Sequence, residues 1–459
     1  MLTIAYNTDD EFDEIKKYYV INRHYENIGI VQVNANDIIL PSYRHTRART
    51  TYRVDTTTTV MKPFITDQYR PMISYQDIHK AIGFSSAIDE LTAQIPAHIP
   101  PCGDSNVIIV IDTGITRHEA FEQGFRIHLS SNIIIPSEAT VEARSVVGDN
   151  GVDDFEIYGH GTAVSYLARV FAPNADIISI KAIHKVGNEF QGTDEDILEA
   201  LDLAIKIIDQ ERKGKHSMGV PYLVEIYNMS FGGEPTLTPT PVELAIQNIS
   251  MRRPQAIFVG AAGNLGPKVG TIVNPSQSPW CIAVGSCNPS SFIVSPFSSR
   301  GPTRSYTKPE YLMPGENITA ASRTGFNNYA IFSGTSFATP LLAGGLATAI
   351  SGIIFVTPQV QNLIKQYENL KLDIKGIINN IGTRITVKPQ VAGANLSGKD
   401  NNYGFGIPYG PLIAKEMGFM IQAIQSPSQL AAAQAISLAN TTLSIGILGL
   451  FMNTLLRLV

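Results

Sequence analysis

Val107-Ile108-Ile109-Val110-Ile111-Asp112-Thr113-Gly114 sets the fold class of this 459-residue chain. Five β-branched residues in an uninterrupted run are typical of a parallel strand that is buried on both faces of its sheet. Similar runs recur at residues 177–180, 256–259 and 282–284, and helical patterns lie between them. Strands that alternate with helices predict an α/β fold with a doubly wound parallel sheet and right-handed crossovers.

The clearest helix is expected after residue 193. Thr193 followed by Asp196 resembles a capping box with Asp in place of Glu. One apolar face then follows, made of Ile197, Leu198, Leu201, Ala204, Ile205 and Ile208. In doubly wound sheets, functional sites gather at the carboxyl ends of the strands, and Asp112 lies at such an end. Gly114 allows the chain to turn sharply there, which leaves the carboxylate facing the site.

Two further stretches carry residues that can complete a nucleophilic site with Asp112. His160 lies in Gly159-His160-Gly161-Thr162, ahead of a helical pattern. Ser336 lies in Gly334-Thr335-Ser336-Phe337-Ala338-Thr339-Pro340, ahead of a second pattern rich in small residues. A serine hydroxyl needs a base within hydrogen-bond reach and a third group that orients the base. A helix start at Ser336 would also offer its amide to a developing oxyanion, with Pro340 in the first turn.

In the order Asp, His, Ser, these motifs resemble the subtilisin-like serine proteases, the subtilases of peptidase family S8. The resemblance covers residues 105–416 as the catalytic domain. It implies a serine endopeptidase that hydrolyses peptide bonds through an acyl-enzyme, with Asp112, His160 and Ser336 as the catalytic triad. Asn264, in Val259-Gly260-Ala261-Ala262-Gly263-Asn264, would be the second oxyanion donor. The alternative is a catalytically silent subtilase-fold interaction or structural module, against which the intact catalytic residues argue.

The resemblance also implies where a protein or peptide substrate would bind. Backbone groups from Ser230 through Phe231 to Gly232 would pair with an extended peptide as an added strand. Ala261 and Gly263 would line the pocket for the residue that precedes the scissile bond. Because both residues are small, a roomy pocket for a sizeable apolar side chain is expected.

No cofactor is required for this chemistry, and no metal ligands are assigned. The strong calcium site of the family is predicted to be absent, because the helix after His160 runs into Val170-Phe171-Ala172-Pro173 without an Asn-rich loop. Four acidic residues lie just before His160, and they could form a different calcium site or a solvated loop that faces substrate. Their spacing lacks the EF-hand pattern, which favours the solvated loop; they are Asp149, Asp153, Asp154 and Glu156.

Residues 1–100 are expected to form a small N-terminal α+β segment and a linker. Apolar runs at 2–6 and 28–33 flank a helical stretch at 9–19, whereas residues 41–75 read as irregular. The resemblance to subtilases implies an inhibitory prodomain, and an unrelated accessory domain is the alternative. If the segment is a prodomain, cleavage that depends on Ser336 is expected in the proline-rich linker between Ile95 and Asp104.

Residues 417–459 form an apolar C-terminal extension with three alternative uses. They could be a membrane anchor, a tail that docks through residues 429–459 on a partner or a second copy, or a helix packed on its own domain. The first ten residues show no secretory signal, so a cytoplasmic or non-classical location is expected, with membrane attachment through the tail as an option.

Composition limits the other partners. A formal net charge of -5 gives no general electrostatic reason to expect nucleic acid. The one basic run, at residues 44–49, is expected to be a solvated loop. Cys102, Cys281 and Cys287 are too few for a disulfide framework and are expected to be buried thiols.

Overall fold

The computed structural model describes residues 1–34, 44–54, 73–94, 103, 106–129, 133–137, 139–155, 158–211, 224–253, 255–356, 386–387 and 398–413. Its centre is a seven-stranded, wholly parallel sheet in the order β16-β15-β14-β13-β6-β10-β9. The strands are β6 (Asn106–Asp112), β9 (Val141–Ser145), β10 (Asp176–Lys181), β13 (Val224–Met229), β14 (Ala256–Ala261), β15 (Cys281–Cys287) and β16 (Tyr311–Pro314). The predicted α/β fold with a doubly wound parallel sheet is therefore confirmed.

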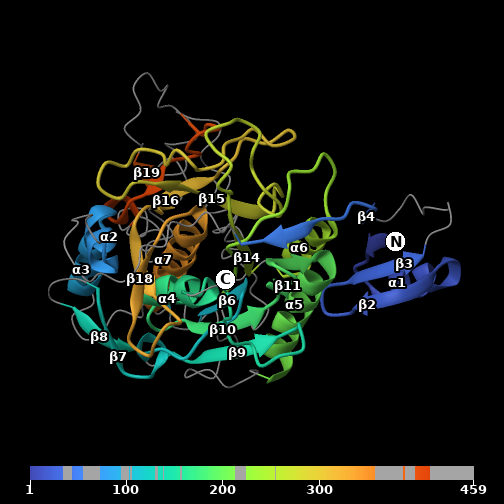
Figure 1. Cartoon of the computed structure of the whole chain (residues 1–459), viewed down its shortest axis with the longest axis horizontal. Coiled ribbons are helices and arrows are strands. Elements are labelled where there is room, and N and C mark those ends of the chain that lie inside the picture. The colour runs from blue at the N-terminus through green and yellow to red at the C-terminus, as the bar shows by residue number, and fades with distance from the viewer. Residues whose placement is uncertain are drawn as a thin grey trace, which may run out of the picture.

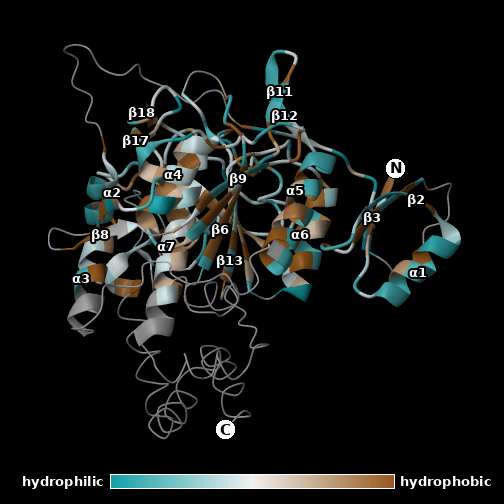
Figure 2. Ribbon diagram, turned by 90° about the horizontal axis from the view of Figure 1, so that it is seen from below, coloured by the Kyte–Doolittle hydropathy of each residue, from teal (hydrophilic) through white to brown (hydrophobic). Residues whose placement is uncertain are grey.

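Helices cover both faces of this sheet, which is why its inner strands are apolar throughout. Helices α4 (Gly161–Phe171) and α7 (Thr335–Val356) pack on one face. Helices α5 (Asp194–Lys206) and α6 (Pro241–Arg252) pack on the other, and Figure 2 shows the brown strands between the two pairs. Every residue of β6, β13, β14 and β15 is buried, as expected for parallel strands covered on both sides.

The order of the strands reverses between β6 and β13, which makes this the topological switch point of the sheet. From β6 the chain first builds β9 and β10 on one side, and then β13 to β16 on the other. Sites in doubly wound sheets lie at the carboxyl ends of the strands beside such a switch. Asp112 ends β6, and Ser230 directly follows β13.

Smaller elements surround the sheet. They are helices α2 (Tyr75–Ala81) and α3 (Phe84–Gln94), the 3-10 turn η1 (Glu119–Phe121), the π turn η2 (Ile207–Glu211), and strands β7 (Phe125–His128), β8 (Ile134–Ser137), β11 (His184–Val186), β12 (Glu189–Thr193), β17 (Ile318–Ala321), β18 (Tyr329–Phe332), β19 (Thr386–Val387) and β20 (Ile407–Pro408). The predicted capping box at the start of α5 is present, since Thr193 and Asp196 bond each other's backbone N–H groups.

The N-terminal residues form a separate antiparallel sheet in the order β2-β3-β1-β4. Its elements are β1 (Leu2–Ala5), α1 (Asp9–Tyr18), β2 (Val20–Tyr25), β3 (Ile30–Asn34) and β4 (Arg44–Thr46). This sheet packs against α5 and α6, on the right of Figure 1. Asn248 of α6 fixes the contact, because its amide donates to the carbonyl oxygens of Tyr6 and Ile28 at 3.0 and 2.7 Å.

Only the second half of the basic run at residues 44–49 is the solvated loop that its composition suggested, since Arg47 and Arg49 are exposed and lie outside any strand. Arg44, His45 and Thr46 form β4, which pairs with β1. The Arg44 guanidinium donates to the side chain of Asn248, and Arg49 donates to Thr3 Oγ1 at 3.3 Å. The expectation was wrong for residues 44–46, because pairing with β1 and the bond to Asn248 hold them in the N-terminal sheet and against α6.

Beyond β4 the chain leaves the N-terminal sheet and joins the part of the molecule that is built on the parallel sheet. Strand β5 (Thr51–Arg53) pairs antiparallel with β12, and in Figure 1 the blue chain can be followed from β4 towards the centre of the molecule. We call residues 50–54 the docked segment. The expectation that residues 41–75 are irregular is wrong at this point, because pairing partners from distant parts of the chain make β5 a strand.

Several expectations fall outside the described residues. These are the linker at 95–102 and 104–105, the whole C-terminal extension at 417–459, Cys102 and Glu156. Within the described ranges, no helix has both the length and the hydropathy to cross a membrane. Cys281 and Cys287 are buried on β15 as thiols, as expected.

Candidate active site

Asp112 and His160 meet at the carboxyl end of β6. The Asp112 side chain is fully buried, and its Oδ1 lies 2.7 Å from Nδ1 of His160. The same oxygen accepts the backbone N–H of Thr113 at 2.7 Å. Two donors on one oxygen fix the carboxylate against the imidazole, so the histidine ring is oriented from its Nδ1 side.

His160 is the residue that precedes the first turn of α4, and the backbone around it is crowded. A Cβ at Gly161 would lie 2.2 Å from the carbonyl oxygen of Gly114, so only glycine fits there. The ring of Phe337 lies 5.2 Å from the imidazole, centroid to centroid. Because Phe337 follows Ser336, this contact brings the start of α7 to the histidine.

Asp153 joins the segments that carry Asp112 and His160. Its buried carboxylate accepts the Thr113 hydroxyl at 2.9 Å and both the N–H and the hydroxyl of Thr162, at 2.8 and 2.7 Å. Burial raises the pKa of Asp153 above its ordinary value, although these hydrogen bonds oppose the shift. One sequence signal points to this role, namely the hydroxyl residues directly after Asp112 and Gly161.

The other acidic residues near His160 are partners of one lysine. Asp149 and Asp154 lie 2.7 and 3.0 Å from Lys181 Nζ, and the Lys181 side chain is 2% exposed. Asp149 and Asp154 remain exposed, at 40% and 47%, so the expectation of a solvated acidic loop is wrong for Asp153 alone, which is buried. In the described ranges no three His, Cys, Asp or Glu side chains are grouped to hold a metal ion. The absence of the family's calcium site stays a prediction.

Ser336 is the second residue of α7, and it is bonded reciprocally to Ser230. The Ser336 hydroxyl donates to the Ser230 carbonyl oxygen at 2.9 Å, and the Ser230 hydroxyl donates to the Ser336 carbonyl oxygen at 2.8 Å. Pro340 explains the second bond. It is the sixth helical residue, beyond the first turn where it was expected, so the Ser336 carbonyl lacks its usual helical N–H partner.

Asn264 lies beside the start of α7. Its Oδ1 accepts both the N–H and the hydroxyl of Thr335 at 2.9 Å. The amide nitrogen therefore points the other way, and it lies 3.3 Å from the place that a Cβ at Gly334 would take. An N–H₂ donor thus stands next to the residues that precede the Ser336 amide.

The segment after β13 is paired with the docked segment. Arg53 and Gly232 exchange two backbone hydrogen bonds, each 2.9 Å long. Phe231 is buried against Tyr52, whose ring lies 5.4 Å away edge to face. Residues 51–53 are therefore the middle strand between β12 and Gly232. This position is the one expected for a substrate peptide.

Ala261 and Gly263 lie at the end of β14, and Val273 packs close by. A Cβ at Gly263 would lie 2.6 Å from Val273 Cγ1, and one at Gly232 would lie 2.4 Å from Val273 Cγ2. The glycines are needed because Val273 sits between them. The roomy pocket inferred from their size stays a prediction, with Val273 as part of its wall.

Comparisons with known proteins agree with this geometry. The chain belongs to the subtilase family, because the family model Peptidase_S8 matches residues 103–406. The match includes Asp112, His160, Asn264 and Ser336, and it leaves out the N-terminal sheet.

Individual relatives are similar over shorter stretches. Serine protease AprX of Bacillus subtilis (strain 168) is 29% identical over 291 residues, which are 57% of this chain and 61% of AprX. Subtilisin E of the same organism is 31% identical over 159 residues, which are 32% of this chain and 38% of subtilisin E. The chain therefore spans less than two thirds of these relatives. A crystal structure of a lanthipeptide protease shares the fold with a TM-score of 0.50 at 18% identity, covering 74% of this chain and 96% of that chain.

Proposed function

We propose that this chain is a serine endopeptidase that cleaves peptide bonds through an acyl-enzyme. The observation that carries the proposal is the 2.7 Å contact between His160 Nδ1 and Asp112 Oδ1, at the strand ends where α7 presents Ser336. Asp112 holds the proton on Nδ1, so Nε2 of His160 is the base. His160 takes the Ser336 proton during attack and returns it to the leaving amine.

The Ser336 hydroxyl has to change its acceptor for this step. It donates to the Ser230 carbonyl oxygen in the structure. We propose that it turns to His160 when a substrate carbonyl arrives, because the strand-paired substrate would itself compete for the backbone groups of Ser230. The Ser230 hydroxyl keeps the helix start in place meanwhile, since it holds the Ser336 carbonyl oxygen.

Two donors would stabilise the oxyanion. One is the Ser336 amide in the first turn of α7, where N–H groups have no helical acceptor. The other is the side-chain amide of Asn264, whose oxygen is already fixed by Thr335. A donor that is held in advance costs no reorganisation when the charge develops.

We also propose that residues 1–54 act as an inhibitory N-terminal domain, so that the full chain is a zymogen. The support is that the docked segment takes the strand position beside Gly232, where an extended substrate would pair. The docked segment is antiparallel to the segment after β13, so the residues that follow Arg53 lie alongside those that precede Gly232. The docked segment therefore leads towards Ser230 and its bonded partner Ser336, which a substrate peptide must also reach.

Labelling with a fluorophosphonate tests the catalytic proposal. Such a probe reacts only with an activated serine, so wild type should be labelled and Ser336→Ala should not. Ser333→Ala is the matched control, because this neighbouring hydroxyl accepts the N–H of Asn317 and lies outside the proposed triad. Absence of label from the processed wild type would leave the silent interaction module as the better account.

Mass spectrometry of the purified protein tests the zymogen proposal. We expect a shortened chain for wild type and a full-length chain for Ser336→Ala. The new N-terminus would distinguish cleavage shortly after Val54 from cleavage between Ile95 and Asp104. A full-length wild type that labels as fast as any shortened form would refute an inhibitory role for residues 1–54.

A further inference from the structure

Tyr52 of the docked segment is a fully buried side chain with a specific polar environment. Its hydroxyl donates to Asp194 Oδ1 at 3.2 Å and lies 3.2 Å from Thr240 Oγ1. The edge-to-face contact with Phe231 covers the ring. The carboxylate and the hydroxyl therefore mark a place for a phenol rather than for a plain apolar ring.

The two polar partners of Tyr52 stand at helix starts outside the docked segment. Asp194 is the first residue of α5, directly after the capping residue Thr193. Thr240 caps α6, and its hydroxyl accepts the N–H of Glu243 at 3.3 Å. Both partners thus belong to the rigid body of the catalytic domain.

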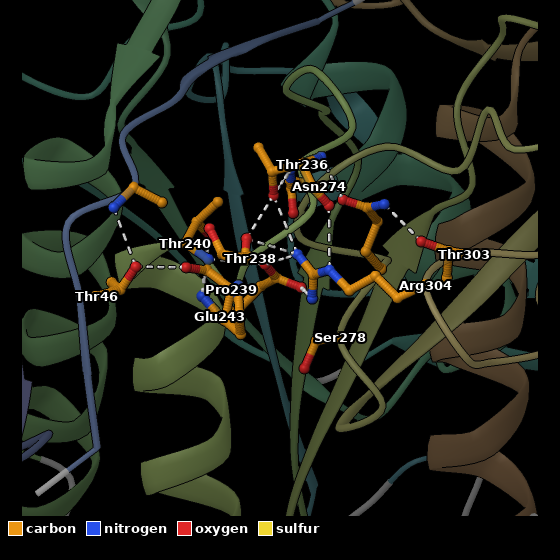
Figure 3. A network of polar contacts seen from close by, with 12 residues as sticks. Thr46, Thr236, Thr238, Pro239, Thr240, Glu243, Asn274, Ser278, Thr303 and Arg304 are labelled. Carbon is orange, nitrogen blue, oxygen red and sulfur yellow. Dashed lines mark hydrogen bonds and ion pairs between the residues drawn. The ribbon is translucent and has the colours of Figure 1, made fainter. Parts of the chain in front are cut away.

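A second layer of contacts holds Thr240. The Glu243 carboxylate accepts the Thr240 N–H at 2.8 Å, and Arg304 binds this carboxylate with two nitrogens, at 2.9 and 2.8 Å. Arg304 also donates to the carbonyl oxygens of Thr236 and Thr238, so it closes the loop before α6 (Figure 3). The Thr240 side of the place filled by the Tyr52 hydroxyl is therefore held by contacts outside the docked segment, and Asp194 supplies the other side from the first turn of α5.

The backbone contacts of the docked segment can be made by any extended peptide. Arg53 bonds Gly232, and the Thr50 N–H donates to Asp194 Oδ2 at 2.9 Å. Two side chains of the docked segment have specific polar partners: Arg53 forms an exposed ion pair with Glu189 at 2.9 Å, whereas the Tyr52 hydroxyl is buried between Asp194 and Thr240. Gly232 lies two residues after Ser230, so an antiparallel strand continued from Arg53 would place the residue two positions later beside Ser336. Tyr52 thus corresponds to the fourth residue on the amino side of a scissile bond.

We propose that Asp194 and Thr240 select a tyrosine at this fourth position of the peptide substrate. The inference rests on the proposed function, since it treats the docked segment as a stand-in for substrate. A site built to bond a hydroxyl disfavours an analogue without it, because buried polar groups are then left unpaired. One such hydrogen bond to a carboxylate predicts a preference for Tyr over Phe of about tenfold or more in kcat/KM.

The test uses paired peptides that differ only by Tyr or Phe at the fourth position, with kcat/KM measured on the form of the chain that a fluorophosphonate labels. Labelling shows first that the serine is active, so failure of the proposed function is seen separately. Wild type should prefer Tyr about tenfold or more. Asp194→Leu, of similar shape, should remove or reverse the preference, whereas Glu195→Leu on the same turn should keep it.

Two results would overturn the proposal. One is a labelled wild type that cleaves the Tyr and Phe peptides equally well. The other is an Asp194→Leu protein that still prefers Tyr as strongly as wild type does. If Asp194→Leu does not fold, two measurements on wild type still test the proposal. One is the ratio of kcat/KM for the Tyr and Phe substrates. The other is the inhibition of substrate cleavage by two peptides that span residues 48–54, one with Tyr52 and one with Phe in its place. The proposal requires the Tyr52 peptide to be the tighter inhibitor.

Discussion

Replacing Ser230 by Ala tests how the start of α7 is held. The Ser230 hydroxyl donates to the carbonyl oxygen of Ser336 at 2.8 Å and accepts from Asn228 Nδ2 at 2.9 Å. All three residues are buried. Ser230→Ala leaves one acceptor and one donor without these partners, and each such group costs about 1–3 kcal/mol. We therefore expect the free energy of unfolding to fall by about 2–4 kcal/mol.

A second substitution isolates the share of this destabilisation that comes from the lost hydrogen bond to the Ser336 carbonyl oxygen. Pro340→Ala restores a backbone N–H four residues after position 336, so the carbonyl oxygen there gains the normal helical bond. In this background Ser230→Ala strands only the Asn228 amide, and its cost should fall by about 1–2 kcal/mol. Any effect of losing a proline from the unfolded chain, about 0.4–1 kcal/mol, is the same with and without Ser230 and cancels in the comparison.

Denaturant unfolding gives the four free energies that this double-mutant cycle needs. The measurements belong in a Ser336→Ala background, which prevents self-digestion and keeps the backbone carbonyl at position 336. Ser351→Ala is the control, because it lies further along α7 and should add to Pro340→Ala within about 0.5 kcal/mol. If Ser230→Ala is equally additive with Pro340→Ala, the argument that the serine replaces the missing helical bond is refuted.

Three further predictions concern groups around the site. Asp153→Asn places an amide N–H₂ against buried N–H donors, so it should lower the free energy of unfolding by about 1–3 kcal/mol and reduce kcat. The control Asp154→Asn changes an exposed partner of Lys181 and should lower the free energy of unfolding by less than about 1 kcal/mol. Asn264→Ala should lower kcat by about 100–1,000-fold with little change in KM, a magnitude taken from the corresponding donor of a subtilisin; an unchanged kcat would remove Asn264 from the oxyanion site. Burial raises the pKa of Asp194 from 3.8 to about 7, so the docked state holds the extra proton and docking should weaken as pH rises through this range. Binding of a residue 1–54 fragment to the processed enzyme should show this loss at pH 8 relative to pH 5, and Asp194→Asn should remove it.

The central strands could be predicted from the sequence because they carry no competing signal. The run 107–111 is apolar at every position, as a parallel strand between two helical layers must be. Strand β13 was harder to find, since Glu225 is its second residue. The structure pairs this buried carboxylate with Arg253 from the end of α6. A charge that is neutralised by a residue 28 positions away cannot be recognised from a local pattern.

The residues of the candidate site also divide into those that a local sequence pattern predicts and those whose surroundings depend on distant parts of the chain. Asp112, His160 and Ser336 stand at element boundaries and carry recognisable neighbours, so the sequence was sufficient to nominate them. Asp153 was placed in a solvated loop, because the hydroxyl groups that bury it come from Thr113, 40 residues earlier, and from Thr162. Acidic residues are usually exposed unless a partner is present, and the partner is set by the fold.

Asp194 shows why a carboxylate suits a position that an asparagine could also fill. An amide oxygen would accept a hydrogen bond from the Tyr52 hydroxyl equally well at any pH. A carboxylate also accepts this bond, but the free energy needed to bury it is larger when it is ionised, so the strength of docking depends on pH. The pairing with Gly232 and β12 is backbone pairing and does not respond to pH. Burial is the largest cause of the raised Asp194 pKa, and Thr50 and Tyr52 of the docked segment lie against this carboxylate. Their hydrogen bonds and the charge of Arg49 lower the pKa and so oppose the shift in part, whereas Glu195 adds to it. The raised pKa is therefore a property of the docked state. The residue that we infer to read tyrosine in the substrate is thus also the group whose ionisation weakens the hold on the N-terminal segment.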